Sequence, residues 1–362
     1  MNYQIDKNSP KSAYLQLYEQ LRRDIVNGVY RAGDKLPSKR LLSEEADVSV
    51  ITVEHAYAIL SDEGYVESRE RSGYFVIYRQ DDFFSPADDA QEKTHAPRFG
   101  AHMPVGEDFP FSQFARTMRR VLSEYGERIL LKSPNQGCPE IRKAISAYLA
   151  RSRGMRVRPE QIVIGSGAEY LYSLIVQLLG KERTFAIESP SYEKIRSVYE
   201  ANGVTLEMLK MGKDGIRSEE LAKARATVLH VTPFNSYPSH VTVGASKKNE
   251  YLSFAKSRGG FVIEDNYDSE LTVSSKHEDT LFSLSDSDSV LYLNTFSQTV
   301  APGIRVGYLV LPPSLLPIFH EKLGFYSCTV PVFEQYVLAE WIESGDFERH
   351  INRIRRARRK NG

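Results

Sequence analysis

The stretch Val290–Leu311, VLYLNTFSQTVAPGIRVGYLVL, indicates the fold of most of this 362-residue chain. An apolar run is followed by hydroxyl residues that include Thr295 and Ser297, then by Arg305 and a second apolar run. The pattern predicts two strands joined by a polar turn. Hydroxyl groups, backbone N–H groups and one guanidinium suit a phosphate, because arginine offers paired donors that match its oxygens. The alternative is a solvated loop between two buried strands.

The same kind of apolar, strand-like run recurs from residue 100 onward and alternates with helical stretches. The runs are IVIG (162–165), TFAIE (184–188), TLEMLK (205–210), ATVLHVTP (226–233), FVIED (261–265), VLYLNTF (290–296) and VGYLVLP (306–312). Helical stretches such as AEYLYSLIVQLL lie between most of them. This rhythm predicts a mostly parallel, seven-stranded sheet of the α/β class, in which ligands bind at the carboxyl ends of the strands.

Polar segments follow three of the predicted strands and are expected to converge at that edge. In GSGAEY, the backbone of Ser166, Gly167 and Ala168 opens a helix, whose free N–H groups and dipole favour a bound phosphate. Asp265 ends a buried strand and can pair with a protonated ring nitrogen, while Tyr267 can donate to a ring oxygen. The alternative for Asp265 is a carboxylate that caps the next turn.

The first 79 residues predict a different unit. Helical spacing of apolar residues predicts helices in 12–28, 38–46 and 49–64, and the alternation in YVESRERSGYFVIY predicts a hairpin over 65–78. Three helices followed by a hairpin are typical of a winged helix-turn-helix, an α+β domain.

This unit resembles the GntR family of bacterial regulators in GDKLPSKR and in the wing segment RSGYFV. The resemblance implies that the unit binds operator DNA through phosphate contacts, the recognition helix and the wing. The residues implied are Lys35, Ser38, Lys39 and Arg40 for phosphates, Ser49, Thr52 and His55 for the major groove, and Arg69, Arg71 and Gly73 for the wing. The family usually reads S-R-x-T-V where this chain reads SVITV, so one favoured arginine contact is missing.

Charge does not by itself identify DNA as the partner. Residues 1–79 carry 11 Lys and Arg against 12 Asp and Glu, a net charge of 11 − 12 = −1, and the whole chain has 47 of each sign. Non-specific DNA affinity is therefore expected to be modest. The alternative is a winged helix used for protein contacts.

The composition predicts two domains joined by a linker. Residues 80–99 mix Pro, Asp and Ala without a sustained period, which indicates a linker between a domain at 1–79 and one at 100–362. Cys138 and Cys328 stand alone, and no apolar run approaches the roughly 18 residues of a membrane span. We therefore expect a cytoplasmic protein, associated with the bacterial nucleoid when it is bound to DNA.

The second domain resembles the aminotransferase-like domain of the MocR subfamily, in which a GntR-type unit is joined to a fold type I aminotransferase domain. The segments that carry the resemblance are RGMRVRPEQIVIGSGAEYL, ESPSY, VTPFNSYPS, FVIEDNYDSE and NTFSQTVAPGIRVGYLVLP. The resemblance implies pyridoxal 5′-phosphate (PLP) as cofactor, with Asp265 under the ring nitrogen and Tyr267 near the ring oxygen. It also implies that Tyr192 stacks near the ring and that Ser297 and Arg305 bind the phosphate.

Gln298 departs from the family motif T-F-S-K, because this chain reads T-F-S-Q at the position of the Schiff-base lysine. A carboxamide cannot condense with an aldehyde or carry the proton that transamination moves. We therefore predict no catalytic residue, no metal, and PLP held non-covalently if it binds.

The C-terminal segment, SGDFERHINRIRRARRKNG, matches the start of the helix that leads to the small domain of the family, and that domain is expected to be missing. The basic run Arg353–Lys360 is interpreted as a solvated helix end, with a DNA-binding tail as the alternative.

Three functions remain open from the sequence. The first is a transcriptional regulator that dimerises and senses PLP, an amino acid or an amine. The second is a PLP-dependent aminotransferase with an accessory DNA-binding domain. The third is a scaffold that dimerises the DNA-binding unit and senses nothing.

Overall fold

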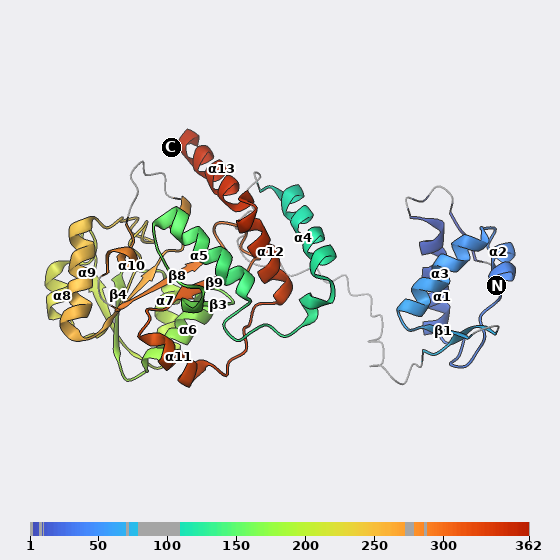
Figure 1. The fold of residues 1–362 in the computed structure, drawn as a ribbon, viewed down its shortest axis with the longest axis horizontal. Coiled ribbons are helices and arrows are strands. Elements are labelled where there is room, and N and C mark those ends of the chain that lie inside the picture. The colour runs from blue at the N-terminus through green and yellow to red at the C-terminus, as the bar shows by residue number, and fades with distance from the viewer. Residues whose placement is uncertain are drawn as a thin grey trace. The chain divides into compact units, whose positions relative to one another are not determined.

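The computed structural model describes residues 3–6, 9, 11–69, 72–78, 109–271, 279–285 and 288–361. The chain divides into two compact units, Met1–Phe99 and Gly100–Gly362 (Figure 1). The predicted linker at 80–99 lies outside the described residues, so the domain boundaries at 79 and 100 remain a prediction.

The N-terminal unit is the predicted winged helix-turn-helix. Its elements are α1 (Ala13–Val26), α2 (Lys39–Glu45), α3 (Val50–Asp62) and an antiparallel pair, β1 (Val66–Arg69) and β2 (Gly73–Val76). Ser38 and Ser49 cap α2 and α3, because their hydroxyl oxygens accept hydrogen bonds from the N–H groups of Leu41 and Thr52. The apolar faces of the three helices pack into one core that contains the fully buried Tyr57.

The C-terminal unit is built on one seven-stranded sheet, as the sequence predicts. Its strands are β3 (Ile162–Gly165), β4 (Thr184–Ser189), β5 (Thr205–Lys210), β6 (Val228–Val231), β7 (Phe261–Asp265), β8 (Val290–Thr295) and β9 (Gly307–Val310). They lie in the order β3-β9-β8-β7-β6-β4-β5. The pairs from β8 through to β5 are parallel, whereas β9 is antiparallel to both β8 and β3.

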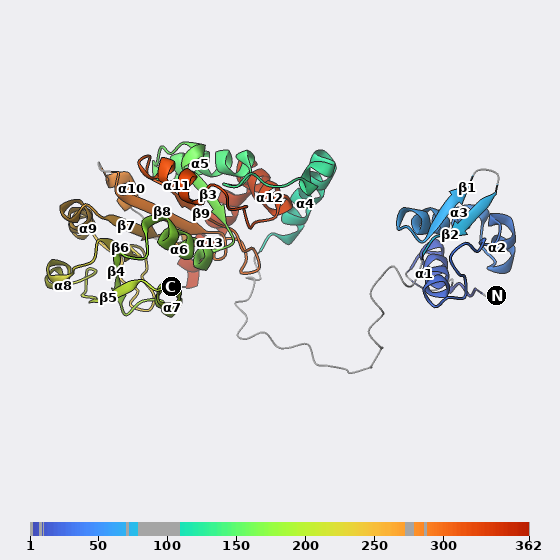
Figure 2. The same ribbon diagram turned by 90° about the horizontal axis from the view of Figure 1, so that it is seen from below.

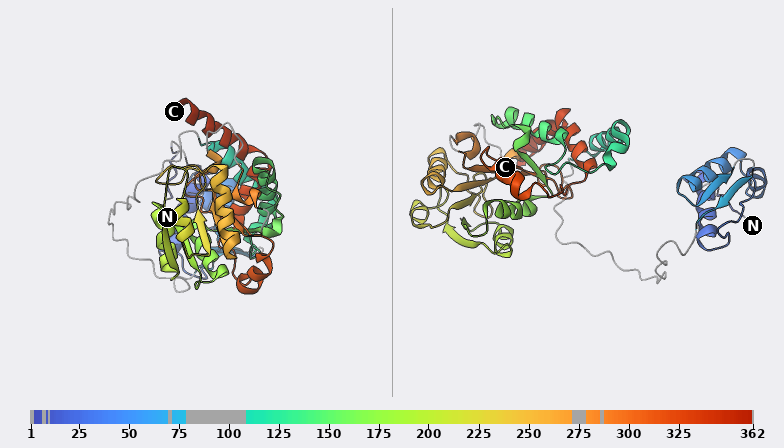
Figure 3. Two further views of the ribbon diagram at one scale, coloured as in Figure 1. Left: turned by 90° about the vertical axis from the view of Figure 1, so that its left-hand side faces the viewer. Right: turned by 60° about the horizontal axis from the view of Figure 1, so that its bottom comes forward.

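Helices cover both faces of this sheet (Figure 2). They are α4 (Phe111–Tyr125), α5 (Pro139–Arg153), α6 (Ala168–Leu179), α7 (Glu193–Ala201), α8 (Ser218–Lys223), α9 (Ala245–Arg258), α10 (Leu281–Leu284), α11 (Leu315–Leu323), α12 (Val332–Glu343) and α13 (Asp346–Asn361). Short 3₁₀ helices are η2 (Gly126–Leu130), η3 (Pro159–Gln161) and η4 (Ser269–Leu271). Figure 3 shows the same layers from two further sides.

Alternate residues of the buried strands point to opposite faces, which fixes how the layers pack. Ile263 of β7 packs with α6, α7 and α11, whereas its neighbour Val262 packs with α8, α9 and α10. Where both faces are covered, the strand sequences are continuous apolar runs, such as IVIG in β3 and VLYL in β8. The polar loops are left at the carboxyl ends of the parallel strands. Within the described ranges, no helix is long and apolar enough to cross a membrane.

Candidate functional site

A cavity of about 530 Å³ opens at the carboxyl ends of the parallel strands. Eight of the ten predicted cofactor-binding residues line it: Ala168, Tyr192, Asp265, Tyr267, Thr295, Ser297, Gln298 and Arg305. Ser166 and Gly167 precede α6 beside it without lining it themselves. The three segments that the sequence singled out therefore meet at one cavity.

Asp265 lies at the floor of the cavity and is only 2% exposed. Its Oδ2 accepts a hydrogen bond from the hydroxyl of Tyr172 and lies 3.5 Å from Nε2 of His230. No donor among the described residues reaches its Oδ1, which is buried. A buried acceptor without a partner is costly, and a protonated ring nitrogen in the cavity would satisfy it.

The partners of Asp265 are themselves held in place. The hydroxyl of Tyr199 lies 2.7 Å from Nδ1 of His230, and both rings pack against Tyr172. Burial, followed by the charge of Asp265, raises the pKa of Tyr172 well above its usual value. Tyr172 therefore stays protonated and donates to the carboxylate, which fixes the orientation of Asp265.

The phosphate side of the cavity is formed by Arg305 and the start of α6. Gly167 has φ +100°, and a Cβ at this position would lie 2.7 Å from Nη2 of Arg305. Only glycine therefore lets the guanidinium lie against the backbone at the helix N-terminus. A guanidinium beside free N–H groups fits an oxyanion, which agrees with the phosphate expected there.

Two residues that the sequence did not assign, Glu169 and Lys194, share this side of the cavity. Oε2 of Glu169 lies 2.8 Å from Nη2 of Arg305, and Oε1 lies 3.2 Å from Nζ of Lys194. Burial raises the pKa of Glu169, but hydrogen bonds from its own backbone N–H and from Lys194, together with the charge of Arg305, outweigh burial and hold that pKa below its usual value. Glu169 is therefore an anion where a phosphate is expected.

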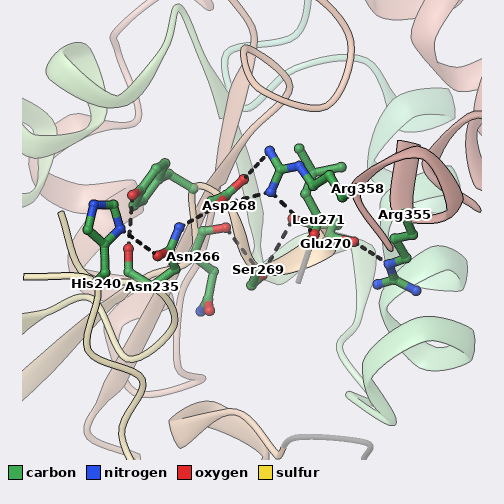
Figure 4. Close-up of polar contacts among 10 residues, drawn as sticks. Asn235, His240, Asn266, Asp268, Ser269, Glu270, Leu271, Arg355 and Arg358 are labelled. Atoms are coloured by element: carbon green, nitrogen blue, oxygen red, sulfur yellow. Dashed lines mark hydrogen bonds and ion pairs between the residues drawn. The ribbon is translucent and has the colours of Figure 1, made fainter. Parts of the chain in front are cut away.

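The rim of the cavity carries a polar network that reaches α13 (Figure 4). The hydroxyl of Tyr267 donates to the backbone oxygen of Asn235 at 3.0 Å, and Nδ2 of Asn235 donates to Oδ2 of Asp268 at 2.8 Å. Arg358 approaches both carboxylate oxygens of Asp268, at 3.4 and 3.5 Å. Burial, followed by the charge of Asp268, raises the pKa of Tyr267 to about 12.

This network changes the interpretation of the basic run at the end of the chain. Arg355 donates to the backbone oxygen of Glu270 at 2.6 Å, and Arg358 donates to that of Leu271 at 3.3 Å (Figure 4). The run is therefore not simply a solvated helix end. One side of α13 is docked on η4, and Arg358 lines the cavity.

Glu188, at the end of β4, is a second buried carboxyl group near the site. Ser236 Oγ donates to it at 2.5 Å and the N–H of Thr232 at 3.2 Å. Burial raises the pKa of Glu188 to about 7, the two hydrogen bonds oppose the rise, and the charge of Asp265 adds to it. Its protonation therefore changes near neutral pH.

In the N-terminal unit, the predicted DNA-binding residues lie on α2, on α3 and at the wing. Lys35, Ser38, Arg40, Ser49, His55 and Arg69 are exposed, and Lys39, Thr52 and Gly73 are half-buried, while Arg71 lies outside the described residues. Gly73 has φ +107°, and a Cβ there would lie 3.1 Å from Cε of Lys35, which places that lysine at the wing. Whether these residues bind DNA remains a prediction.

Some of these side chains already have protein partners. Nζ of Lys39 lies 2.6 Å from Oε1 of Glu54, and the ring of His55 packs edge-on against Tyr14 at 5.7 Å. Two residues that the sequence did not assign, Val50 and Ile51, are 45% and 64% exposed in the first turn of α3. Large apolar residues exposed at the start of a recognition helix are available for contact with thymine methyl groups.

Among the pocket residues that sequence reasoning did not assign are Glu169, Tyr172, Lys194, Thr232, Asp268 and Arg358. Helical spacing could have found Tyr172, because it lies four residues after Ala168 on α6 and so faces the same side. Asp268 follows Asp265 closely in the segment already singled out. No local signal links Arg358 to Asp268, which lies 90 residues earlier in the chain.

Comparison with known proteins agrees with both units. Residues 13–76 match the family described as bacterial regulatory proteins, gntR family, and residues 107–360 match aminotransferase class I and II. The chain is 32% identical to the HTH-type transcriptional regulator YdeL of Bacillus subtilis, over 96% of this chain and 77% of YdeL. It is 28% identical to the probable rhizopine catabolism regulatory protein MocR of Rhizobium meliloti, over 97% of this chain and 76% of MocR.

Solved structures similar to this chain include aminotransferases. An archaeal alanine:glyoxylate aminotransferase has a TM-score of 0.63 and 23% identity, over 68% of this chain. LysN, the α-aminoadipate aminotransferase of Thermus thermophilus, has a TM-score of 0.62 and 26% identity over 71% of this chain, and its structure contains N-(5′-phosphopyridoxyl)-L-leucine. The chain spans 63% of the first structure and 67% of the second.

Proposed function

Because the chain belongs to the MocR subfamily of GntR-type transcriptional regulators, we propose that its aminotransferase-like domain binds PLP as a non-covalent effector. The effector is PLP itself or a compound of PLP with an amino acid or amine. Binding changes the affinity of the winged helix-turn-helix unit for operator DNA, and no transaminase turnover accompanies it.

One observation carries this proposal: the same cavity holds Asp265 and Gln298. Asp265 has a buried oxygen without a partner in the described part of the chain, which suits the ring nitrogen of PLP. Arg305 and the N-terminus of α6 suit the phosphate. PLP, when bound, supplies an electron-accepting ring and an aldehyde, and the protein supplies binding, orientation and electrostatics.

Gln298 supports sensing rather than turnover. Its carboxamide is not a nucleophile towards an aldehyde and does not carry a proton near neutral pH. Lys194 is the one lysine among the described residues that line the cavity. A hydrogen bond from Lys194 to Glu169 raises the pKa of its ammonium group, so Lys194 stays protonated and does not replace the missing lysine.

The DNA-binding part of the proposal concerns a homodimer in the bacterial cytoplasm. We propose that residues 1–79 read one half-site and that residues 100–362 form the dimer and the effector domain. Two linked half-sites follow, because each recognition helix needs its own major groove.

A mobility-shift assay tests the proposal with DNA from the promoter upstream of the protein's own gene. We expect retention of that fragment at low salt and a change in apparent affinity when PLP is added. Failure to retain any promoter fragment contradicts the role in regulation. Retention that PLP, amino acids and amines all leave unchanged supports a scaffold that senses nothing.

A further inference from the structure

Two basic side chains converge on one carboxylate at the phosphate side of the cavity. Each carboxylate oxygen of Glu169 contacts one basic group. Oε2 lies 2.8 Å from Nη2 of Arg305, and Oε1 lies 3.2 Å from Nζ of Lys194. Glu169 lies in the first turn of α6, where the helix dipole also favours a negative charge. The carboxylate therefore makes the contacts that an oxyanion of a bound phosphate would make.

We propose that Glu169 holds the anion site of the cavity until a phosphate group displaces it, and that Glu169 thereby sets the affinity for phosphate-bearing ligands. The inference rests on the proposed binding of PLP in this cavity. Beyond that binding, we infer that the carboxylate of Glu169 competes with the phosphate of the ligand for the two basic groups.

The guanidinium of Arg305 already lies at the anion site, and the carboxylate of Glu169 can turn away from it. Arg305 lies against the backbone of Gly167, where a Cβ would come within 2.7 Å of its Nη2. The glutamate side chain has rotatable bonds and is about one third exposed, so it can turn towards solvent. Displacement therefore requires rotation of the Glu169 side chain, because the guanidinium already lies against the backbone at the start of α6.

The two ion pairs are weak enough to be exchanged. The side chains of Arg305 and Lys194 are 51% and 60% exposed, and ion pairs between exposed groups contribute little to stability. A phosphate monoester brings nearly two negative charges and three acceptor oxygens, so it makes stronger contacts with both cations than one carboxylate does.

Glu169 also alters the charge that an incoming phosphate meets. With the carboxylate in place, Arg305, Lys194 and Glu169 together carry one net positive charge, and without it the two cations carry two. Part of the binding free energy of the phosphate is therefore lost in displacing or repelling Glu169. A ligand that has the same ring and no phosphate does not meet this cost.

Isothermal titration calorimetry of the full chain with PLP, and separately with pyridoxal, tests the inference. Glu169→Gln keeps the shape of the side chain and removes its charge. The matched control is Glu200→Gln, which removes a glutamate of α7 paired with Arg196 at 2.7 Å, outside the cavity. Thermal melting checks that each variant is folded.

We expect Glu169→Gln to tighten PLP binding about tenfold or more, since charge-assisted contacts at Arg305 and Lys194 become free for the phosphate. Pyridoxal binding should stay within about twofold, and Glu200→Gln should resemble the wild type with both ligands.

Unchanged or weaker PLP binding by Glu169→Gln would overturn the inference and leave the proposed function in place. An equal gain for PLP and pyridoxal would overturn it as well, because the phosphate would then not be involved. Failure of PLP to bind the wild type and both variants would overturn the proposed function, and this inference with it.

Discussion

The guanidinium of Arg358 lies 3.4 Å from Oδ1 of Asp268, which joins α13 to the rim of the cavity (Figure 4). Asp268 is 6% exposed and also accepts a hydrogen bond from Asn235, so this carboxylate is held from two sides. Arg358 is therefore a cation placed at the mouth of a site that is proposed to bind an anionic ligand.

The first prediction concerns ligands that carry a carboxylate. Arg358→Gln should weaken binding of an N-(5′-phosphopyridoxyl) amino acid about tenfold, because a charge-assisted hydrogen bond is lost. Binding of PLP alone should change little. Arg356→Gln is the matched control, since Arg356 is exposed on the same helix and does not line the cavity. Calorimetric titration with both ligands checks this, and equal losses for the two ligands would contradict it.

The second prediction concerns the pairing of Asp265 with the ring nitrogen. Asp265→Asn should weaken PLP binding about tenfold or more, because the amide cannot pair with a protonated nitrogen as an anion does. The 1-deaza analogue of PLP, with carbon in place of the ring nitrogen, provides the control. The wild type should prefer PLP to this analogue, and Asp265→Asn should not. A wild type that binds both ligands equally would show that Oδ1 of Asp265 is not the contact.

The third prediction concerns DNA. Arg40→Gln should weaken binding almost uniformly across sequences and reduce the slope of log affinity against log salt by about 1, because one phosphate contact is lost. Arg40 is exposed on α2, and its Nε lies 3.4 Å from Oε1 of Glu44, which is itself exposed, so the charge of Arg40 is available to a phosphate. Thr52→Ala, on α3, is the contrast: it should change base preference and leave the salt slope unaltered. Fluorescence anisotropy at several salt concentrations measures both quantities.

The fourth prediction concerns pH. The folded-state pKa of Glu188 is raised to about 7, above its value in the unfolded chain, so the unfolded state binds fewer protons between these two values. Glu188 therefore makes the protein less stable as pH rises from about 4.5 to about 7. Glu188→Gln should remove this dependence and stabilise the protein at pH 8 on the order of 2–3 kcal/mol. Urea unfolding at several pH values measures the free energy of unfolding of both proteins. If the wild-type value changed with pH in parallel with that of Glu188→Gln, the prediction would be wrong.

The sequence predicts the large sheet well because most of its strands are buried on both faces. Runs such as VLYL in β8 are apolar throughout, and loops at the carboxyl ends of the parallel strands carry polar residues. By contrast, α12 shows no polar face, since nine of its residues, including Gln335 and Glu340, are buried. A helix buried nearly all round has no amphipathic period to detect.

The sequence predicted those site residues that lie in local motifs, but not the contacts between residues far apart in the chain. Asp265 and Arg305 lie in motifs that place them at strand ends, and both line the cavity. Glu169 lies in GSGAEY, but its pairing with Arg305 spans 136 residues, and that of Arg358 with Asp268 spans 90. A run of arginines suggests solvation, and only the packing of α12 and α13 brings one of them to the rim.

The most direct test of the central claim is whether PLP binds to the wild-type chain reversibly. The protein is saturated with PLP and the sample is divided into two portions. One portion is dialysed, and the other is reduced with borohydride, after which its mass is measured by mass spectrometry. We predict full loss of PLP on dialysis and no added mass after reduction, while Gln298→Lys, as the positive control, gains the mass of one reduced cofactor. Added mass on the wild-type chain would contradict the account, because a different amine would then hold PLP covalently and turnover would again be open.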